Sequence, residues 1–175
     1  MHVYFDLDNT LVDSEGDSLR PGIKELLSSL TSNGIKLSIW TASTHERAKP
    51  IIDKLDIGKY FNNFVFREDY DPYAEGHGKD IRYLDGDLLV DDDPKQIEYV
   101  RSIGKRGFLI SPYIKSQAVN GEELERLHAM ILHQTKFLID RKIASTPQTQ
   151  IETGGANNPL PYDLLREQTL KSQKV

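Results

Sequence analysis

Short apolar runs that alternate with segments of helical spacing are the feature that most constrains the fold of this chain. In the segments between the runs, apolar residues recur every three or four positions, as on the buried face of a helix. Strands that alternate with helices in this way indicate a parallel sheet covered on both faces. We therefore expect a doubly wound, Rossmann-like α/β fold. The strand-like runs are residues 3–5, 35–40, 64–66, 88–90 and 107–110.

The expected helices follow these runs, and the last of them ends the folded part of the chain. Pro21 suits the first turn of a helix that Gly34 ends, a second helix covers about residues 45–55, and Pro94 begins a third. Apolar residues at helical spacing over residues 121–141 predict a C-terminal helix that packs on the sheet. The sequence after it is polar and poor in core-forming residues. We therefore expect one domain, residues 1–142, and a polar, flexible tail, residues 143–175.

The composition fits one globular domain and excludes several classes of function. The chain has 175 residues, of which 38% are hydrophobic, enough for a core. Its net charge of −5 argues against a general affinity for nucleic acids or anionic membranes. Cysteine is absent, which excludes disulfides, thiolate metal sites and cysteine-dependent phosphatases. No signal peptide or membrane-spanning apolar run is visible, so we expect a cytoplasmic location; no feature of the sequence indicates an oligomeric state.

Asp6, Thr41 and Asp91 each come directly after an apolar run. In an open parallel sheet, ligands bind at the carboxyl ends of the strands, so the fold should bring these three residues to one edge. Residues two apart on an extended chain point to the same side. Asp8 therefore addresses the same crevice as Asp6 if the first strand continues through Leu7.

The acidic residues at this edge would form an all-oxygen cluster. Asp6 and Asp8, joined by one or two of the three aspartates at 91–93, offer the hard ligands that suit Mg²⁺. Asp93 itself is more typical of a residue that starts a helix. Beside a bound cation, one carboxylate can attack the phosphorus of a substrate while its neighbour exchanges protons with the leaving group.

Four segments of the chain carry the candidate site residues, and each lies at the end of an expected strand or in the loop before one. They are FDLDNTLV at residues 5–12, Thr41 after SIW, Lys79 in GKDI, and VDDDP at residues 90–94. These segments resemble the four motifs of the haloacid dehalogenase superfamily of phosphohydrolases. The resemblance covers about residues 1–112.

The resemblance implies roles for the carboxylates. Asp6 would be the nucleophile that forms an aspartyl-phosphate. Asp8 would be the general acid that protonates the leaving oxygen and later the base that activates water. Mg²⁺ would be held by Asp6, by the backbone carbonyl of Asp8, and by Asp91 or Asp92.

It also implies which residues contact the phosphate. Thr41 would donate to a phosphate oxygen, with Ala42 beside it. Lys79 would neutralise phosphate charge and restrain the nucleophile, although Lys59 or Lys95 could approach instead. Positioning and electrostatic stabilisation of this kind are what phosphoryl transfer mainly requires.

Within the superfamily, the segments WTAS, FRED, GKDI and VDDDP resemble the small C-terminal-domain phosphatases, also called the NLI-interacting-factor-like group. Members of this group are protein phosphatases without a cap domain. Residues 13–20 are too few for a helical cap, and residues 41–79 leave room for only a small excursion. The expected site is therefore open, and the expected partner is a phosphorylated protein.

Two alternatives remain open at this stage. The same chemistry would serve a small phosphorylated metabolite, a nucleotide or a nucleic acid phosphate end. A non-catalytic binding module is more remote, because such a protein should have lost at least one motif residue. Tyr70 and Tyr73 either shape the mouth of the site or pack within the excursion.

Overall fold

The computed structural model describes residues 1–117 and 121–145, with side chains described as far as residue 141. Residues Met1–Ile143 form one compact unit. The predicted tail, residues 143–175, lies almost wholly outside the described residues. Its boundary with the domain therefore stays a prediction.

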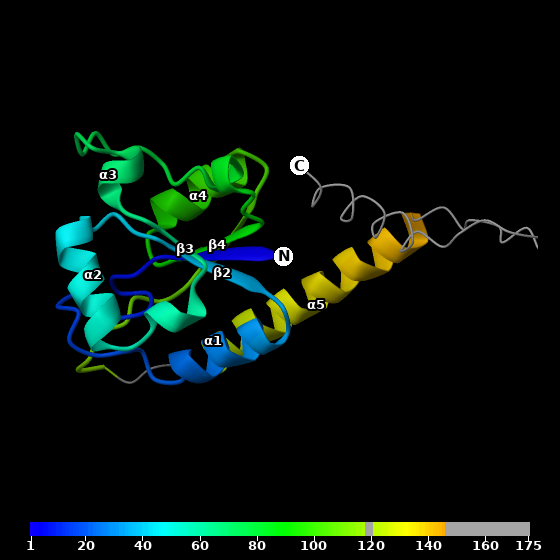
Figure 1. Ribbon diagram of the computed structural model, residues 1–175, viewed down its shortest axis with the longest axis horizontal. Helices are drawn as coiled ribbons and strands as arrows, with labels where there is room; N and C mark the ends of the chain where they lie inside the picture. The colour runs from blue at the N-terminus through cyan, green and yellow to red at the C-terminus, as the bar shows by residue number, and fades with distance from the viewer. Residues whose placement is uncertain (118–120, 146–175) are drawn as a thin grey trace, which may run out of the picture. The chain divides into compact units, whose positions relative to one another are not determined.

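Five parallel strands form one sheet within the described residues, in the order β3-β2-β1-β4-β5 (Figure 1). All five predicted strands are present, with no end shifted by more than one residue. The predicted doubly wound α/β fold is confirmed. The strands are β1 (His2–Phe5), β2 (Lys36–Trp40), β3 (Asn63–Val65), β4 (Leu88–Asp91) and β5 (Arg106–Leu109).

Helices cover both faces of the sheet, and Figure 1 shows α1 and α5 below it and α4 above it. Alternate residues of the central strands enter different cores: Val3 and Phe5 of β1 pack with α1, α2 and α5, whereas Tyr4 packs with α4 and η2. Burial on both faces explains why the strands read as unbroken apolar runs. The helices are α1 (Ile23–Ser32), α2 (His45–Lys54), α3 (Arg67–Tyr70), α4 (Pro94–Ser102) and α5 (Gly121–Ser145), with short 3₁₀ helices η1 (Gly58–Tyr60) and η2 (Ile81–Leu84).

The strand order places a topological switch beside β1. From β1 the chain proceeds through β2 and β3 to one edge, and it then returns to β4 on the other side of β1 and continues to β5. Connections that leave in opposite directions open a crevice at the carboxyl ends of the two central strands. Asp6 follows β1, and Asp91 ends β4.

The described chain has no large domain over this crevice. Residues 6–22, between β1 and α1, contain no helix. The segment between β3 and β4 contributes only the four-residue elements α3 and η2. No helix within residues 1–117 and 121–145 is long and apolar enough to cross a membrane.

Candidate active site

A buried lysine joins the ends of β1 and β4. Lys79 Nζ donates to Asp6 Oδ1 at 2.5 Å and to Asp91 Oδ2 at 2.7 Å. Lys79 is 2% exposed and Asp91 1%. Lys59 pairs with Asp56 at the surface instead. Of the lysines considered from the sequence, Lys79 is the one between the carboxylates.

Asp92 completes a group of three carboxylates with Asp6 and Asp91. One oxygen from each lies within 4.8 Å of the others. The fully buried Thr10 donates from its hydroxyl to Asp92 Oδ1 at 3.1 Å. Asp91 Oδ1 accepts the backbone N–H of Asp93 at 2.9 Å. Hydrogen bonds that do not involve Lys79 thus help to hold two of the three carboxylates, those of Asp91 and Asp92, in place.

Asp93 has a different task from its two neighbours. Its Oδ1 accepts the backbone N–H of Lys95 at 2.9 Å and caps the first turn of α4. This agrees with the interpretation of Asp93 as a helix-start residue. Asp93 is also not in the close carboxylate group, although it lines the same cavity.

Three carboxylates and one ammonium leave an excess of negative charge in a buried place. The pKa of Asp6 is raised to about 7, mainly by burial and also by the charges of Asp91 and Asp92, against the opposing effect of Lys79. Burial and the charge of Asp91 also raise the pKa of Asp92. Burial alone would lower the pKa of Lys79, but Asp6 and Asp91 raise it above its usual value. Lys79 therefore stays charged, and a divalent cation would offset the remaining negative charge.

Asp8 lies at the edge of the site and is held by two donors. Ser43 Oγ and Arg47 Nη1 donate to its two carboxylate oxygens, each at 2.6 Å. Arg47 Nη2 donates to the backbone carbonyl of Ser14 at 2.7 Å. The side chain of Asp8 is 24% exposed and that of Arg47 39%. Sequence reasoning missed Arg47, and its place in the first turn of the helix after Thr41 is the signal that could have found it.

Asp8 reaches the site by a turn and not by an extended strand. β1 ends at Phe5, so the strand does not continue through Leu7 as the sequence argument required. The backbone N–H groups of Leu11 and Val12 both donate to the carbonyl of Leu7, at 2.9 and 3.0 Å. This tight turn brings Asp8 to the same cavity as Asp6.

Thr41 lies directly after β2 and lines the catalytic cavity. Its Oγ1 accepts the backbone N–H of Ser43 at 3.0 Å, which leaves the hydroxyl hydrogen able to donate to an anion. Thr41 is buried, and Ala42 beside it is exposed at the cavity. All the predicted site residues line one cavity of about 290 Å³; they are Asp6, Asp8, Thr41, Ala42, Lys79, Asp91 and Asp92.

A buried arginine supports the loop behind Asp8 and was not predicted. Arg20 donates from Nε to the carbonyl of Thr10 at 2.7 Å and from Nη2 to the carbonyl of Asn9 at 2.9 Å. Its charge is paired with Glu123 of α5, with Nη1 and Oε2 3.7 Å apart. Glu123 Oε1 also accepts the backbone N–H of Ser111 at 2.9 Å. The two charged residues lie 103 positions apart in the sequence, and no local pattern links them.

The model of the NLI interacting factor-like phosphatase family matches residues 1–140. The chain belongs to this family. It is accordingly a phosphatase, a phosphoric monoester hydrolase of the haloacid dehalogenase superfamily. The match runs through most of α5, whereas the sequence motifs supported a resemblance only as far as about residue 112. No curated protein matches the sequence.

Solved structures agree with the family assignment at the level of the fold. An uncharacterized protein from Listeria monocytogenes serotype 4b has a TM-score of 0.55 at 18% identity, covering 77% of this chain and 98% of its own. A haloacid dehalogenase-like family hydrolase from Streptococcus pneumoniae has a TM-score of 0.52 at 14% identity, covering 71% and 89%. At such low identity the likeness shows the fold alone.

Proposed function

We propose that this phosphatase is Mg²⁺-dependent, works through an aspartyl-phosphate on Asp6, and acts on phosphoproteins. The observation that carries the proposal is the buried group of Asp6, Lys79 and Asp91 at the switch point of the sheet. The cytoplasmic location stays a prediction from the sequence.

The carboxylate group fits a hard divalent cation. Its donors are all oxygens, one from each carboxylate lies within 4.8 Å of the others, and its negative charge exceeds what Lys79 neutralises. Asp6, Asp91 or Asp92, and the backbone carbonyl of Asp8 would hold Mg²⁺. When bound, Mg²⁺ supplies positive charge beside the phosphoryl oxygens.

Asp6 and Asp8 act in both steps of the proposed reaction, the formation and the hydrolysis of the aspartyl-phosphate. In the first step Asp6 forms a bond to phosphorus, and the leaving oxygen departs with its electron pair and takes a proton from Asp8. In the second step a water gives its proton to Asp8 and attacks phosphorus, which releases Asp6 as a carboxylate. Lys79 fixes Asp6, and Thr41 donates to a phosphoryl oxygen.

The open surroundings of the cavity favour a protein substrate. Among the described residues, no domain covers the carboxyl ends of β1 and β4, so a phosphorylated side chain on a large molecule can enter. A screen with Mg²⁺ should therefore show higher kcat/KM for phosphopeptides than for nucleotides and sugar phosphates. A strong preference for the small molecules would overturn the protein-phosphatase proposal and leave the chemistry intact.

The role of Asp6 has a direct test. Asp6→Asn should lower turnover of p-nitrophenyl phosphate by at least about 1,000-fold, because an amide cannot form the acyl-phosphate. Circular dichroism should show an unchanged fold. Asp53→Asn makes the same change at an exposed residue of α2 that pairs with Lys49, and it should leave turnover unaltered. Retained hydrolysis by Asp6→Asn would place the nucleophile elsewhere.

A further inference from the structure

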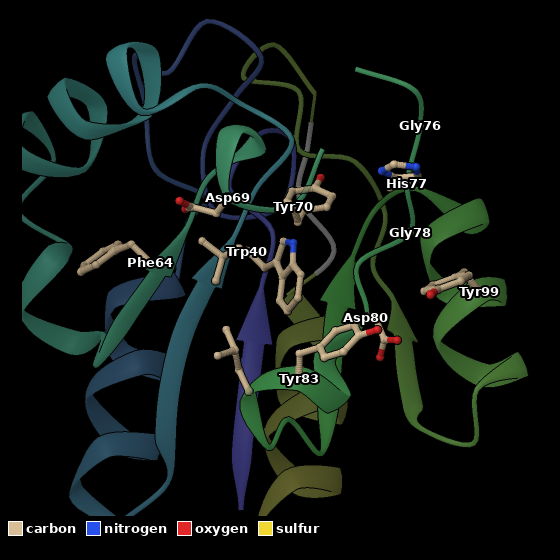
Figure 2. Close-up of a pocket in the computed structure, with 12 residues that line it drawn as sticks. Trp40, Phe64, Asp69, Tyr70, Gly76, His77, Gly78, Asp80, Tyr83 and Tyr99 are labelled. Atoms are coloured by element: carbon tan, nitrogen blue, oxygen red, sulfur yellow. The ribbon is translucent and has the colours of Figure 1, made fainter. Parts of the chain in front are cut away.

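A second and larger cavity of about 940 Å³ lies on the face of the sheet that carries α4. Figure 2 shows aromatic side chains around it: Trp40 from β2, Phe64 from β3, Tyr70 from α3, Tyr83 from η2 and Tyr99 from α4. The backbone of Gly78 passes between them. The excursion between β3 and β4 therefore builds much of this cavity.

The aromatic cavity adjoins the catalytic one. Trp40 immediately precedes Thr41, and Gly78 immediately precedes Lys79, so consecutive residues line the two spaces. Burial raises the pKa of Tyr70, and the charges of Lys79 and Asp6 also act on its phenol. A substrate with its phosphate at Asp6 thus has this cavity beside it.

Close packing fixes one wall of the cavity. A Cβ at Gly78 would lie 2.4 Å from Cδ1 of Tyr99, so the tyrosine ring rests directly on the glycine backbone. On the other side, Trp40 and Tyr70 meet edge to face with ring centroids 5.5 Å apart. Tyr83 is 82% exposed and forms the outer wall. Of the two tyrosines left open by the sequence, Tyr70 both packs and lines the cavity, whereas Tyr73 is 84% exposed and does not line it.

The charges around the cavity favour a cation. Asp69 and Asp80 are part of its lining, and no lysine or arginine among the described residues lines it. A hydrogen bond from Arg82 lowers the pKa of Asp80, so this carboxylate stays ionised. Although Arg82 pairs with Asp80, residues 67–87 as a whole contain seven acidic and three basic side chains. Aromatic faces and nearby carboxylates together attract lysine and arginine side chains.

We propose that the aromatic cavity binds a lysine or arginine side chain that flanks the phosphorylated residue of a protein substrate. This inference rests on the proposed function as a phosphoprotein phosphatase. It gives the phosphatase a preference for a basic residue near the phosphorylated one, with the aromatic rings of Tyr83 and Tyr99 in contact with the basic side chain and the buried Trp40 behind them.

The test uses phosphoserine peptides that differ at one flanking position. A single lysine is placed in turn at each position within about four residues of the phosphoserine, a span that an extended chain covers in roughly 14 Å. At the best position, kcat/KM for lysine should exceed that for norleucine, which has a similar length and no charge, by about tenfold. A peptide with glutamate at that position should have a lower kcat/KM than the norleucine peptide, and added salt should reduce these differences in kcat/KM.

Variants connect the preference to the cavity. Tyr83→Ala should bring the ratio of kcat/KM for the lysine peptide to kcat/KM for the norleucine peptide close to one. Tyr73→Ala removes an equally exposed tyrosine from the same segment and should preserve this ratio. Turnover of p-nitrophenyl phosphate is measured for each variant, so that damage to the catalytic cavity is detected separately.

The outcomes separate the inference from the function on which it rests. If phosphopeptides are good substrates but lysine and norleucine are equivalent, or if norleucine is preferred, the inference is wrong and the protein-phosphatase proposal stands. If Tyr83→Ala keeps the wild-type ratio of kcat/KM for the lysine and norleucine peptides, the basic side chain binds elsewhere and the inference is equally wrong. If no phosphopeptide exceeds small phosphomonoesters, the proposed function fails first.

Discussion

Lys79 is the residue on which the charge balance of the site depends. It is buried between Asp6 and Asp91 and contacts both carboxylates. Removing one partner of a buried ion pair leaves charge without compensation, which costs far more than the pair contributes when intact. The lysine therefore both fixes Asp6, the proposed nucleophile, and stabilises the fold.

Lys79→Met should lower the free energy of unfolding by about 3–5 kcal/mol, because the buried carboxylates of Asp6 and Asp91 then lack their cation. Urea denaturation without added metal measures this loss. Saturating Mg²⁺ should recover more stability in the variant than in the wild type, since a bound cation replaces part of the missing charge. Lys59→Met removes an exposed lysine that pairs with Asp56 and should leave the free energy of unfolding nearly unchanged. Equal losses in the two variants would contradict the assigned role.

His2 makes the stability of the fold depend on pH, separately from the carboxylates around Lys79. Its ring is buried, with Nε2 2.8 Å from Ser38 Oγ. Burial, with a smaller effect of Lys36, lowers the pKa of His2 below its ordinary value of 6.5. The unfolded chain therefore takes up this proton first as the pH falls, so stability is lost below about pH 6.5 until the lowered pKa of the folded state is reached.

The unfolding free energy should fall from pH 7.5 to pH 5.5 by more in the wild type than in His2→Gln, with a slope of at most about 1.4 kcal/mol per pH unit for this one group. Denaturation at the two pH values measures the difference. His45→Gln, at an exposed residue, is the matched control and should retain the wild-type slope. A His2→Gln protein with the same pH dependence as the wild type would show that another group is responsible.

At the scale of elements, α5 does more than cover the sheet. It supplies Glu123, which neutralises the buried Arg20, and Arg20 holds the carbonyls of Asn9 and Thr10 in the loop after Asp8. Arg20 is thus a positioning residue, and α5 is coupled through it to the catalytic loop. The family match through residue 140 is consistent with a helix that belongs to the domain.

Glu123→Gln should lower kcat for p-nitrophenyl phosphate about tenfold or more and leave KM less affected, because the catalytic loop loses its support while the phosphate contacts remain. Stability should fall by about 3 kcal/mol, as expected for a buried arginine without its partner. Glu125→Gln changes an exposed residue of the same helix and should alter neither quantity. A loss of stability with unchanged kcat would reduce the pair to a purely structural role.

The whole molecule is organised around the switch point beside β1. Both halves of the sheet contribute to the catalytic cavity: Thr41 comes from the half with β2 and β3, and Asp91 from the half with β4 and β5. The core that unites them includes Leu124, Leu127 and Ile131 of α5. The catalytic unit therefore needs α5, whereas the family match does not extend to residues 146–175.

Deletion of residues 146–175 should leave kcat/KM for p-nitrophenyl phosphate and the melting temperature close to those of the full chain. Enzyme assays and thermal denaturation measure both. Truncation after residue 120 removes Leu124, Leu127 and Ile131 from the core and should prevent folding. If the shorter deletion also unfolds the protein or abolishes turnover, the predicted domain boundary is wrong.

The sequence by itself determined the fold class, the five strands and the residues around the catalytic cavity. These could be predicted because each strand is a short, mainly apolar run, buried on both faces in β1 and β4, and because Asp6, Thr41 and Asp91 follow such runs directly. The carboxyl ends of parallel strands meet whatever the details of packing. The motifs around Asp8 and Lys79 then placed those residues through their resemblance to a known family.

Only the tertiary structure decided how these residues are held. It showed that Lys79 bridges Asp6 and Asp91, and that Arg47 holds Asp8. It also showed that the pair of Arg20 and Glu123 supports the loop that follows Asp8. The aromatic cavity likewise draws its rings from five separate elements. Such contacts join residues far apart in the sequence, and the direction of each side chain depends on the packing of all the elements around it. Local periodicity carries no information about that packing and did not predict these contacts. The family resemblance implied only that Lys79 restrains Asp6, and the position of Arg47 in the first turn of α2 was the one further signal.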